Sequence, residues 1–417
     1  MTKVAVIGAG IVGVSTAAWA LRDGHEVVLI DKQGPGEGTS YGNAGMLASC
    51  SIVPVSVPGL ARKAPKMLFD PRQPLFLKWG YLPKVAPWLI QFLKNANPAD
   101  TQRIAAALAE ITADSIGEHR AVAEGTPAAD YIVPSDYVFA YRDREHYAGD
   151  AFGWGIRKKH GYEWEVLEGD AVQAYDPALA KDIRCLVRVP GHGFISDPGA
   201  YVKALAAHVV GEGAQLVTGT AEGIVQENGR VTGVRVDGET IAADAVVIAL
   251  GAWSAPLARS LGLTVPLESE RGYHLELYGV NQMPKSPTSV IAGKFVATPM
   301  AGRLRLAGIV EFGGLDAPPS RRPVALLEEN IRTAMPGLTW TEQREWLGHR
   351  PSLPDSLPMI GEVPKVKGAF LGFGHQHVGL TCGPRTGRLL AQLLSGRKPN
   401  VDMAAFAPSR FTTGAQP

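Results

Sequence analysis

Cysteine is scarce in this sequence, with only Cys50, Cys185 and Cys382 among its 417 residues. The three lie far apart and include no Cys-x-x-Cys pair, which excludes a disulfide framework and a cysteine-based metal cluster. We therefore expect no metal site. This pattern is typical of a protein in a reducing compartment, where each thiol serves as a small buried group.

An excess of charge of one sign is also lacking. Lysine and arginine together number 41, aspartate and glutamate 40, and the formal net charge is +1. Proteins that bind nucleic acids hold the phosphates with a clustered basic surface, which this composition does not supply. We therefore expect no nucleic-acid partner.

Long apolar runs are absent as well. No stretch approaches the roughly 20 apolar residues that span a bilayer, and the first residues contain no basic region followed by a removable apolar core. We expect a cytoplasmic protein. Segment 74–94, rich in aromatic residues and lysines and interrupted by Pro83 and Pro87, has two interpretations: packing against the protein's own body, or peripheral contact with the inner membrane.

Glycine is plentiful, and the first glycines follow a strand-like run at residues 3–7. Gly8 permits a tight turn, Gly10 lets backbone N–H groups approach a pyrophosphate, and Gly13 lets the following helix press against the sheet. A second strand-like run ends in Asp31, whose carboxylate is placed to accept hydrogen bonds from an adenosine ribose. The pattern predicts a dinucleotide site.

The loop that follows Asp31 favours FAD over a nicotinamide cofactor. Residues 34–45 are polar and glycine-rich, well suited to wrap a second phosphate and a ribityl chain, which a nicotinamide enzyme would not need. A buried strand at 243–253 and another at 369–373 return the chain to the same sheet. An arrangement in which the first and last segments share one sheet is a recurring solution for FAD.

The remaining pattern predicts a second domain on an antiparallel sheet. Residues 268–319 alternate apolar and polar positions, and strands are also expected near 137–141. The other expected elements are helices at 99–123, 198–210 and 383–394, a strand at 214–220 and a hairpin at 223–236 that turns at Asn228-Gly229. We expect disorder only after Phe411. Arg303 and Arg305 lie on an expected strand, and because strand arginines are usually solvated we leave both outside the site.

Several motifs together give a resemblance that covers nearly the whole chain. They are Val6–Gly13, Thr39–Gly45, Gly193–Pro198, Leu250–Trp253, Gly348–Gly361 and Gly374–Thr381. The chain resembles the D-amino acid oxidase-like FAD-dependent oxidoreductases, and its Thr-Ser-x-x-Asn-Ala-Gly element is similar to that of bacterial D-amino acid dehydrogenases and D-hydroxyproline dehydrogenase-like proteins.

The resemblance implies an α/β fold: a glutathione-reductase-like FAD-binding Rossmann domain with a second α+β substrate domain built on a mostly antiparallel sheet. The implied FAD-binding segments are 1–60, 165–267 and 345–417. The implied substrate-domain segments are 61–164 and 268–344.

The resemblance also implies roles for individual residues. Arg350 would grip the substrate carboxylate with its planar guanidinium, Tyr273 would place a hydroxyl near the same carboxylate, and His375 and His377 would face the substrate. The positions implied to bind FAD are Gly8, Gly10, Ile11, Val12, Gly13, Asp31, Lys32, Thr39, Ser40, Asn43, Ala44, Gly45, Met46, Gly251, Trp253, Gly374, Gln376, His377, Val378, Gly379, Leu380 and Thr381. Neither 43–45 nor 348–354 contains a cysteine, so we expect FAD to be bound non-covalently.

The function implied is oxidation of the Cα–N bond of a D-amino acid or a cyclic imino acid, such as D-proline or D-hydroxyproline, by hydride transfer to flavin N5. Electrons would then pass to a quinone or an electron-transfer protein. Three alternatives stay open: a sarcosine- or glycine-type amine oxidase, an L-2-hydroxy acid dehydrogenase, and a flavoprotein subunit of a larger electron-transfer complex.

Overall fold

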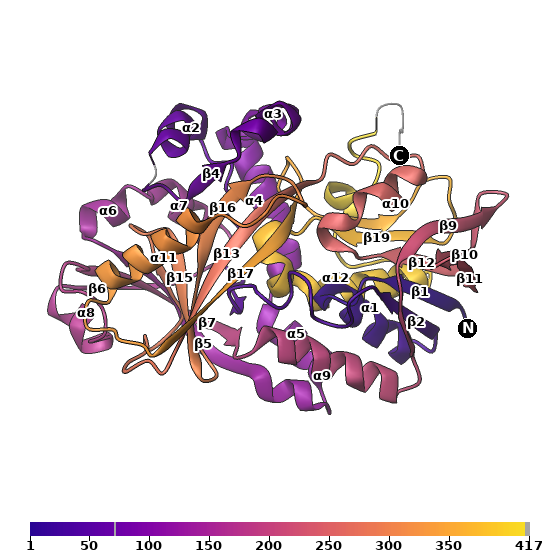
Figure 1. The fold of residues 1–417 in the computed structure, drawn as a ribbon, viewed down its shortest axis with the longest axis horizontal. Coiled ribbons are helices and arrows are strands. Elements are labelled where there is room, and N and C mark those ends of the chain that lie inside the picture. Colours follow the sequence, from indigo (N-terminus) through magenta and orange to yellow (C-terminus); the bar gives the residue numbers. More distant parts are fainter. Residues whose placement is uncertain (71, 413–417) are drawn as a thin grey trace.

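The computed structural model describes residues 1–70 and 72–412, and it builds them around two large sheets that lie side by side (Figure 1). The smaller of these sheets contains the chain's first strand and its last. Most of the second sheet comes from the middle of the chain. In Figure 1 helices α1 and α12 run along the smaller sheet, and α11 lies on the larger one.

The smaller sheet has six strands in the order β18-β19-β12-β1-β2-β8. Its strands are β1 (Lys3–Ile7), β2 (Glu26–Asp31), β8 (Gln215–Thr218), β12 (Ala245–Ile248), β18 (Met359–Glu362) and β19 (Ala369–Phe373). All neighbours are parallel except β18 and β19. The central strands are almost fully buried runs of valine and isoleucine, as expected of a parallel sheet covered on both faces.

Helices and a small sheet surround these strands. They are α1 (Ile11–Arg22), α9 (Pro198–Gly211), α10 (Ala255–Ser260), α12 (Gly379–Leu394) and the antiparallel strands β9 (Ala221–Glu227), β10 (Arg230–Val236) and β11 (Glu239–Ala242). The first and last segments thus share one sheet, as the sequence predicted, and the hairpin at Asn228-Gly229 is confirmed.

The second sheet has ten strands and is mostly antiparallel. Its strands are β3 (Met46–Leu47), β4 (Leu75–Leu77), β5 (Ile132–Tyr141), β6 (Glu165–Glu168), β7 (Cys185–Ile195), β13 (Glu268–Tyr278), β14 (Thr288–Val290), β15 (Phe295–Met300), β16 (Arg303–Phe312) and β17 (Glu342–Ser352). Only β14 with β5 and β16 with β4 pair in parallel. The apolar side chains of β13 and β16 pack with those of α11 (Arg321–Ala334) in one buried cluster.

The remaining helices are α2 (Leu60–Phe69), α3 (Leu82–Lys94), α4 (Pro98–Thr112), α5 (Ser115–Ala123), α6 (Arg144–Ala148), α7 (Ala151–Lys159) and α8 (Asp170–Tyr175). The helix expected over 99–123 is divided in two, because Asp114 adopts a left-handed φ of 48° and caps α5. The last helix starts at Gly379 rather than at 383. Among the residues described, no helix is long and apolar enough to cross a membrane.

Three expected boundaries do not coincide with the passage between the sheets. Strand β3, inside the expected FAD-binding segment 1–60, pairs with β7 in the ten-stranded sheet. Strands β6 and β7, placed with the FAD-binding segment that starts at 165, pair in the ten-stranded sheet. Likewise β17 extends to Ser352, beyond the boundary expected at 345, and pairs along its length with β13. The division into domains stays a prediction, with these strands moved to the second sheet. The expected disorder after Phe411 falls mostly on 413–417, outside the described residues.

Candidate functional site

A cavity of ≈ 610 Å³ lies between the two sheets. Its lining includes the carboxyl ends of the parallel strands on one side and residues of β13, β16 and β17 on the other. This is the edge at which open parallel sheets bind their ligands. All the positions expected to bind FAD line the cavity except Gly13, Gly45 and Gly374.

The glycine turn after β1 takes its shape from two close approaches. Gly8 has a φ of +107°, and a Cβ there would lie 2.4 Å from the carbonyl oxygen of Ala249 on the neighbouring strand segment. A Cβ on Gly13 would lie 1.8 Å from the carbonyl oxygen of Gly8. Gly13 therefore acts by letting α1 approach the strand, while Gly8 and Gly10 face the cavity.

Asp31 is held at the end of β2 by backbone donors. Its Oδ2 accepts from Ala9 N at 2.8 Å, and its Oδ1 accepts from Gln33 N at 2.8 Å and from Gly34 N at 3.0 Å. The carboxylate is thereby fixed at the cavity wall, where its free lone pairs suit the hydroxyls of a ribose. Beside it, Lys32 Nζ lies 4.8 Å above the ring of Trp253, another lining residue.

Two helices direct their N-termini at this cavity. The first turns of α1 and α12 contain no acidic residue, and no side chain of either N-cap accepts a hydrogen bond from the helix. Ile11 N donates to Ser40 Oγ at 3.0 Å, which fastens the 34–45 loop to the start of α1. The positive ends of two helices and their amide groups make a site for negatively charged oxygens.

These groups fit FAD. The α1 turn and Asp31 match the pyrophosphate and the adenosine ribose, and a second positive helix end, 378–381, lies on the same cavity for the flavin ring. Two side chains expected to bind FAD form hydrogen bonds within the protein instead. Thr381 donates its hydroxyl to Met46 O at 3.0 Å, and the Gln376 amide turns toward Leu353 O and Ser356 Oγ.

Arg350 lines the opposite side of the cavity, on β17. Its Nη1 donates to Ile309 O at 3.2 Å, and no carboxylate of the described residues lies within ion-pair distance of it. Its register partner on β13 is Glu270. Burial lowers the pKa of Arg350, and Glu270 opposes this. Burial raises the pKa of Glu270, and Arg350 opposes that shift in turn. The guanidinium of Arg350 thus has N–H donors without a partner among the described residues, in a part of the cavity that is shielded from solvent.

The two histidines differ in their surroundings. His377 is exposed to the cavity, although it lies deep in the protein, and has no hydrogen-bond partner among the described residues. Burial, and secondly the charge of Arg350, lower its pKa to about 4, so the imidazole is neutral at pH 7. His375 is buried, and its Nε2 is 3.0 Å from Thr386 Oγ1 on α12. His375 therefore fastens the loop to the helix.

The structure does not bring the hydroxyl of Tyr273 near Arg350. Side chains alternate along β13, and Gly272, the neighbour of Tyr273, is the residue that faces Arg350. Tyr273 points to the other face, where its hydroxyl donates to Glu311 Oε2 at 2.8 Å and accepts from Ser320 N at 2.8 Å. The expected carboxylate contact is replaced by a contact that holds the start of α11.

Several lining residues were not predicted as part of the site. Four of them lie on strands of the ten-stranded sheet and bear on the argument: Glu270, Gly272, Trp346 and Tyr137. The first three occupy alternate positions of β13 and β17, on the same face as Arg350. The alternation is visible in the sequence, but the face that lines the cavity is known only once the register of β13 with β17 is known. Tyr137 lies on β5, and burial raises the pKa of its hydroxyl well above its ordinary value.

A cavity that fits FAD, lined by an arginine with no carboxylate partner among the described residues, indicates a flavin-dependent oxidoreductase. The chain belongs to the DAO family, described as FAD dependent oxidoreductase, whose family model matches residues 3–393. This confirms the predicted enzyme class, cofactor and fold.

The relatives agree with this assignment. The chain is 40% identical over 415 residues to a D-amino-acid oxidase of Bradyrhizobium diazoefficiens, covering 98% of each. It is 31% identical to a D-amino acid dehydrogenase of Rhizobium rhizogenes, over 98% of this chain and 100% of that one. Its fold matches that of L-proline dehydrogenase from P. horikoshii with a TM-score of 0.73 at 19% identity, over 100% and 99% of the two chains.

Proposed function

We propose that this protein oxidises the Cα–N bond of a D-amino acid or of a cyclic imino acid such as D-proline or D-hydroxyproline. The observation that carries the proposal is Arg350, a guanidinium with free donors and no ion-pair partner, at a cavity built for FAD. A planar guanidinium pairs bidentately with a carboxylate and so orients the α-carbon of the substrate. The names of the two relatives above support the amino acid as substrate and the D configuration.

FAD, when bound, supplies the acceptor for the hydrogen and the electron pair that leave the substrate's α-carbon. The protein's own residues bind and orient. Arg350 neutralises the carboxylate and fixes its direction, while Gly272 leaves room for the guanidinium. The neutral imidazole of His377 adds no charge that would repel the substrate's amino group, and it offers a hydrogen-bond acceptor to that group.

Anaerobic reduction of the holoenzyme tests this proposal. The flavin absorbance should bleach on mixing with D-amino acids, D-proline or D-hydroxyproline. L-amino acids, sarcosine, glycine and 2-hydroxy acids should act at least about tenfold more slowly. Faster bleaching by sarcosine or glycine, or by an L-2-hydroxy acid, would replace this function with one of those two activities. If no small substrate bleached the flavin and a second polypeptide copurified, an electron-transfer subunit would be the better assignment.

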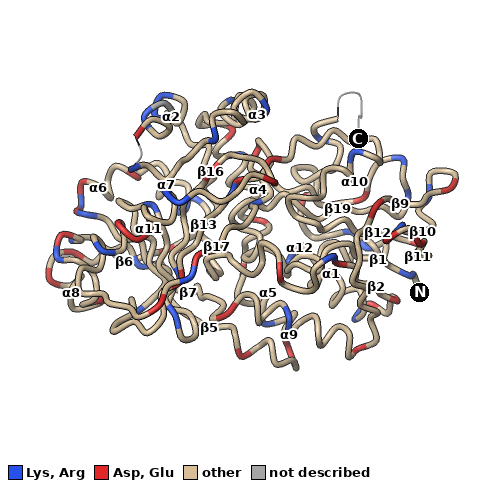
Figure 2. The backbone as a smooth tube through the Cα atoms, in the orientation of Figure 1, with Lys and Arg blue, Asp and Glu red and all other residues tan. Residues whose placement is uncertain are grey.

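We further propose that the electrons leave to a quinone or to an electron-transfer protein. The support is an exposed apolar surface formed by α2, the turn at 79–81 and α3, where Phe69 stacks on Trp79 with ring centroids 5.5 Å apart and both rings are exposed. Figure 2 shows basic residues on both helices, and the sequences of α2 and α3 include Lys66 and Lys84. A basic surface with exposed aromatic rings suits an anionic membrane. The rival acceptor is oxygen, which the name of the 40% identical relative favours.

Segment 74–94 combines the two interpretations that its sequence allowed. Trp88 and Phe92 are buried and pack against the protein's own body, whereas Trp79 and Ile90 are 53% and 57% exposed. Co-sedimentation with vesicles tests the membrane contact. The protein should pellet with vesicles containing an anionic lipid and less so after Trp79→Ser with Ile90→Ser. Equal recovery of both proteins in the supernatant would contradict the contact.

A further inference from the structure

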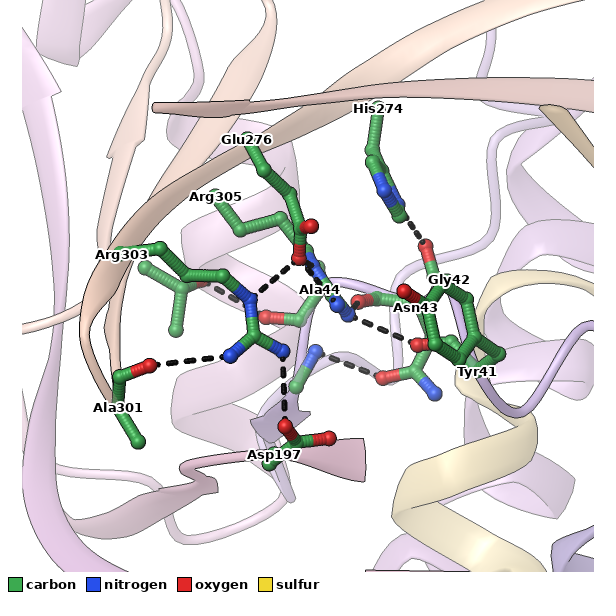
Figure 3. A network of polar contacts seen from close by, with 12 residues as sticks. Tyr41, Gly42, Asn43, Ala44, Asp197, His274, Glu276, Ala301, Arg303 and Arg305 are labelled. Carbon is green, nitrogen blue, oxygen red and sulfur yellow. Dashed lines mark hydrogen bonds and ion pairs between the residues drawn. The ribbon is translucent and has the colours of Figure 1, made fainter. Parts of the chain in front are cut away.

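The loop of residues 41–44 lies on the cavity wall and is hydrogen-bonded, on its side away from the cavity, to side chains of the ten-stranded sheet. Each of its four backbone carbonyls accepts a hydrogen bond from a side chain of β13, β15 or β16 (Figure 3). The bonds run from Arg305 Nη1 to Tyr41 O (3.0 Å) and to Asn43 O (2.7 Å), from His274 Nδ1 to Gly42 O (2.9 Å), and from Thr298 Oγ1 to Ala44 O (2.7 Å). Because a carbonyl only accepts, His274 carries its proton on Nδ1.

This arrangement directs the amide groups of the loop. In a trans peptide the C=O and the N–H point in opposite directions, and none of the described peptides is cis. Carbonyls that face the ten-stranded sheet therefore leave the N–H groups of Gly42, Asn43 and Ala44 facing away from it. These three N–H groups have no acceptor among the described residues, and all three residues line the cavity. The loop thus presents a row of unused donors to the cofactor site.

Arg305 is the residue that bonds two of these carbonyls, and it is itself fixed. Its side chain is fully buried, and Glu276 Oε1 accepts from its Nε at 3.0 Å and from its Nη2 at 2.6 Å. Tyr278 donates to the other oxygen of Glu276 at 2.8 Å. Burial opposes the charge of Glu276, but the two arginines outweigh it and lower its pKa to about 2. The expectation that Arg305 is solvated is wrong.

Arg303 shares the same carboxylate without touching the loop. Its Nε donates to Glu276 Oε1 at 2.5 Å, its Nη1 to Ala301 O at 3.0 Å and its Nη2 to Asp197 Oδ2 at 3.1 Å. It is also buried, contrary to expectation. The chain therefore contains two arginines on one strand, both paired with Glu276, of which only Arg305 reaches the loop (Figure 3).

We propose that Arg305 is a positioning residue for FAD: held by Glu276, it turns the peptides of the 41–44 loop so that their N–H groups donate to acceptor atoms of the cofactor. This inference rests on the proposed function only in placing FAD in this cavity. It does not depend on which substrate is oxidised. The energetic reason is that a buried carbonyl without a hydrogen-bond donor is unfavourable, so the peptide would rotate until its C=O found another donor. A rotated peptide would present its C=O, instead of its N–H, to the cofactor.

Arg305→Met and Arg303→Met form the test, because each removes one arginine from Glu276. We would measure the Kd of FAD from the fluorescence released on dilution of the holoenzyme, the visible spectrum of the bound flavin, and the melting temperature at saturating FAD. Arg305→Met should weaken FAD binding by roughly 10- to 100-fold and shift the flavin spectrum. Both variants should lower the melting temperature by a similar amount. Arg303→Met, however, should change the Kd of FAD by less than about threefold.

Two further variants keep the proposal open to refutation if Arg305→Met does not fold. Thr298→Val removes the bond to Ala44 O, whose peptide carries the Gly45 N–H that already donates to Asn43 Oδ1, so it should change the Kd of FAD by less than about threefold. Arg305→Lys retains the pairing with Glu276 but not the fork, and should lie between the wild type and Arg305→Met. Equal FAD affinities of the Arg303→Met and Arg305→Met variants, or a wild-type Kd in Arg305→Lys, would overturn the proposal. Failure of amino acids to bleach the flavin would refute the proposed function and leave these affinities unaffected.

Discussion

The guanidinium of Arg350 rests over the Cα of Gly272 on the neighbouring strand. A Cβ at Gly272 would lie 2.7 Å from Arg350 Cζ and 2.8 Å from its Nη2, so any side chain there must displace the arginine. The absence of a side chain at 272 thus lets the guanidinium of Arg350 lie against β13, where we propose that it binds the substrate carboxylate.

Gly272→Ala should therefore damage substrate binding more than cofactor binding. We expect kcat/KM to fall by roughly 10- to 100-fold, mainly through KM, because the guanidinium moves by a fraction of an ångström or more from its working position. The FAD content should stay at the wild-type level. Gly211→Ala is the control, since a Cβ there meets nothing within 4 Å. Unchanged kinetics in Gly272→Ala would show that Arg350 does not need this position.

Replacing Arg350 tests its role directly. Arg350→Lys keeps a charge but loses the bidentate fork, and Arg350→Met leaves the substrate carboxylate unpaired. Removing one partner of such a pair costs about 2–5 kcal/mol, or roughly 30- to several-thousand-fold in kcat/KM. The loss should be much smaller for an amine without a carboxylate. If Arg350→Met bleached with a D-amino acid at wild-type efficiency, Arg350 would not bind the carboxylate.

Gly10→Val should prevent FAD binding. A Cβ at Gly10 already lies 3.1 Å from Ser40 Oγ, and the valine methyl groups would enter the space expected for the pyrophosphate. We expect colourless protein that folds, as judged by circular dichroism. Gly223→Val on β9 is the control, because a Cβ there has no neighbour within 4 Å. Stoichiometric flavin in a folded Gly10→Val protein would contradict the assignment of this turn.

The buried imidazole of His274 predicts acid sensitivity. Burial and then the charge of Arg305 lower its pKa from 6.5 to about 3. As the pH falls below 6.5, His274 binds a proton in the unfolded chain but not in the folded chain. The free energy of unfolding therefore decreases between pH 6.5 and about 3. From pH 6.5 to 5 this loss is about 1.5–2 kcal/mol.

His274→Gln should reduce this loss, because a glutamine amide can donate to Gly42 O and does not titrate. We would compare melting temperatures at pH 7 and pH 5, at saturating FAD, for the wild type, His274→Gln and the half-buried His208→Gln. The wild type and His208→Gln should show the same drop, and His274→Gln a smaller one. An identical drop in all three would mean that His274 titrates freely in the folded protein.

The rates at which different acceptors reoxidise the reduced flavin identify the electron acceptor. If the acceptor is a quinone or a protein, enzyme reduced by a D-amino acid should be reoxidised by a quinone analogue or a dye at least about tenfold faster than by air-saturated buffer. Stopped-flow absorbance of the flavin measures both rates. Peroxide formation as fast as reduction of the dye would instead assign this protein to the oxidases.

Much of the cofactor site could be predicted because its signals are local. The turn from β1 through Gly8 to α1, and the acid at the end of β2, are set by residues within one βαβ unit. The parts that sequence reasoning missed depend on pairing between distant strands. Whether Tyr273 faces Arg350 or α11 is decided by the register of β13 with β17, and the burial of Arg305 by a loop 264 residues away.

The packing of α12 beside α1 has a consequence for how the protein acquires its cofactor. The cavity needs both the Gly8 turn and the amides at Gly379, which are synthesised at opposite ends of the translation of this chain. A nascent chain that has completed β1, α1 and β2 holds only half of the site. We therefore expect flavin to bind stably only after α12 has been synthesised, and products truncated before α12 should be recovered without flavin.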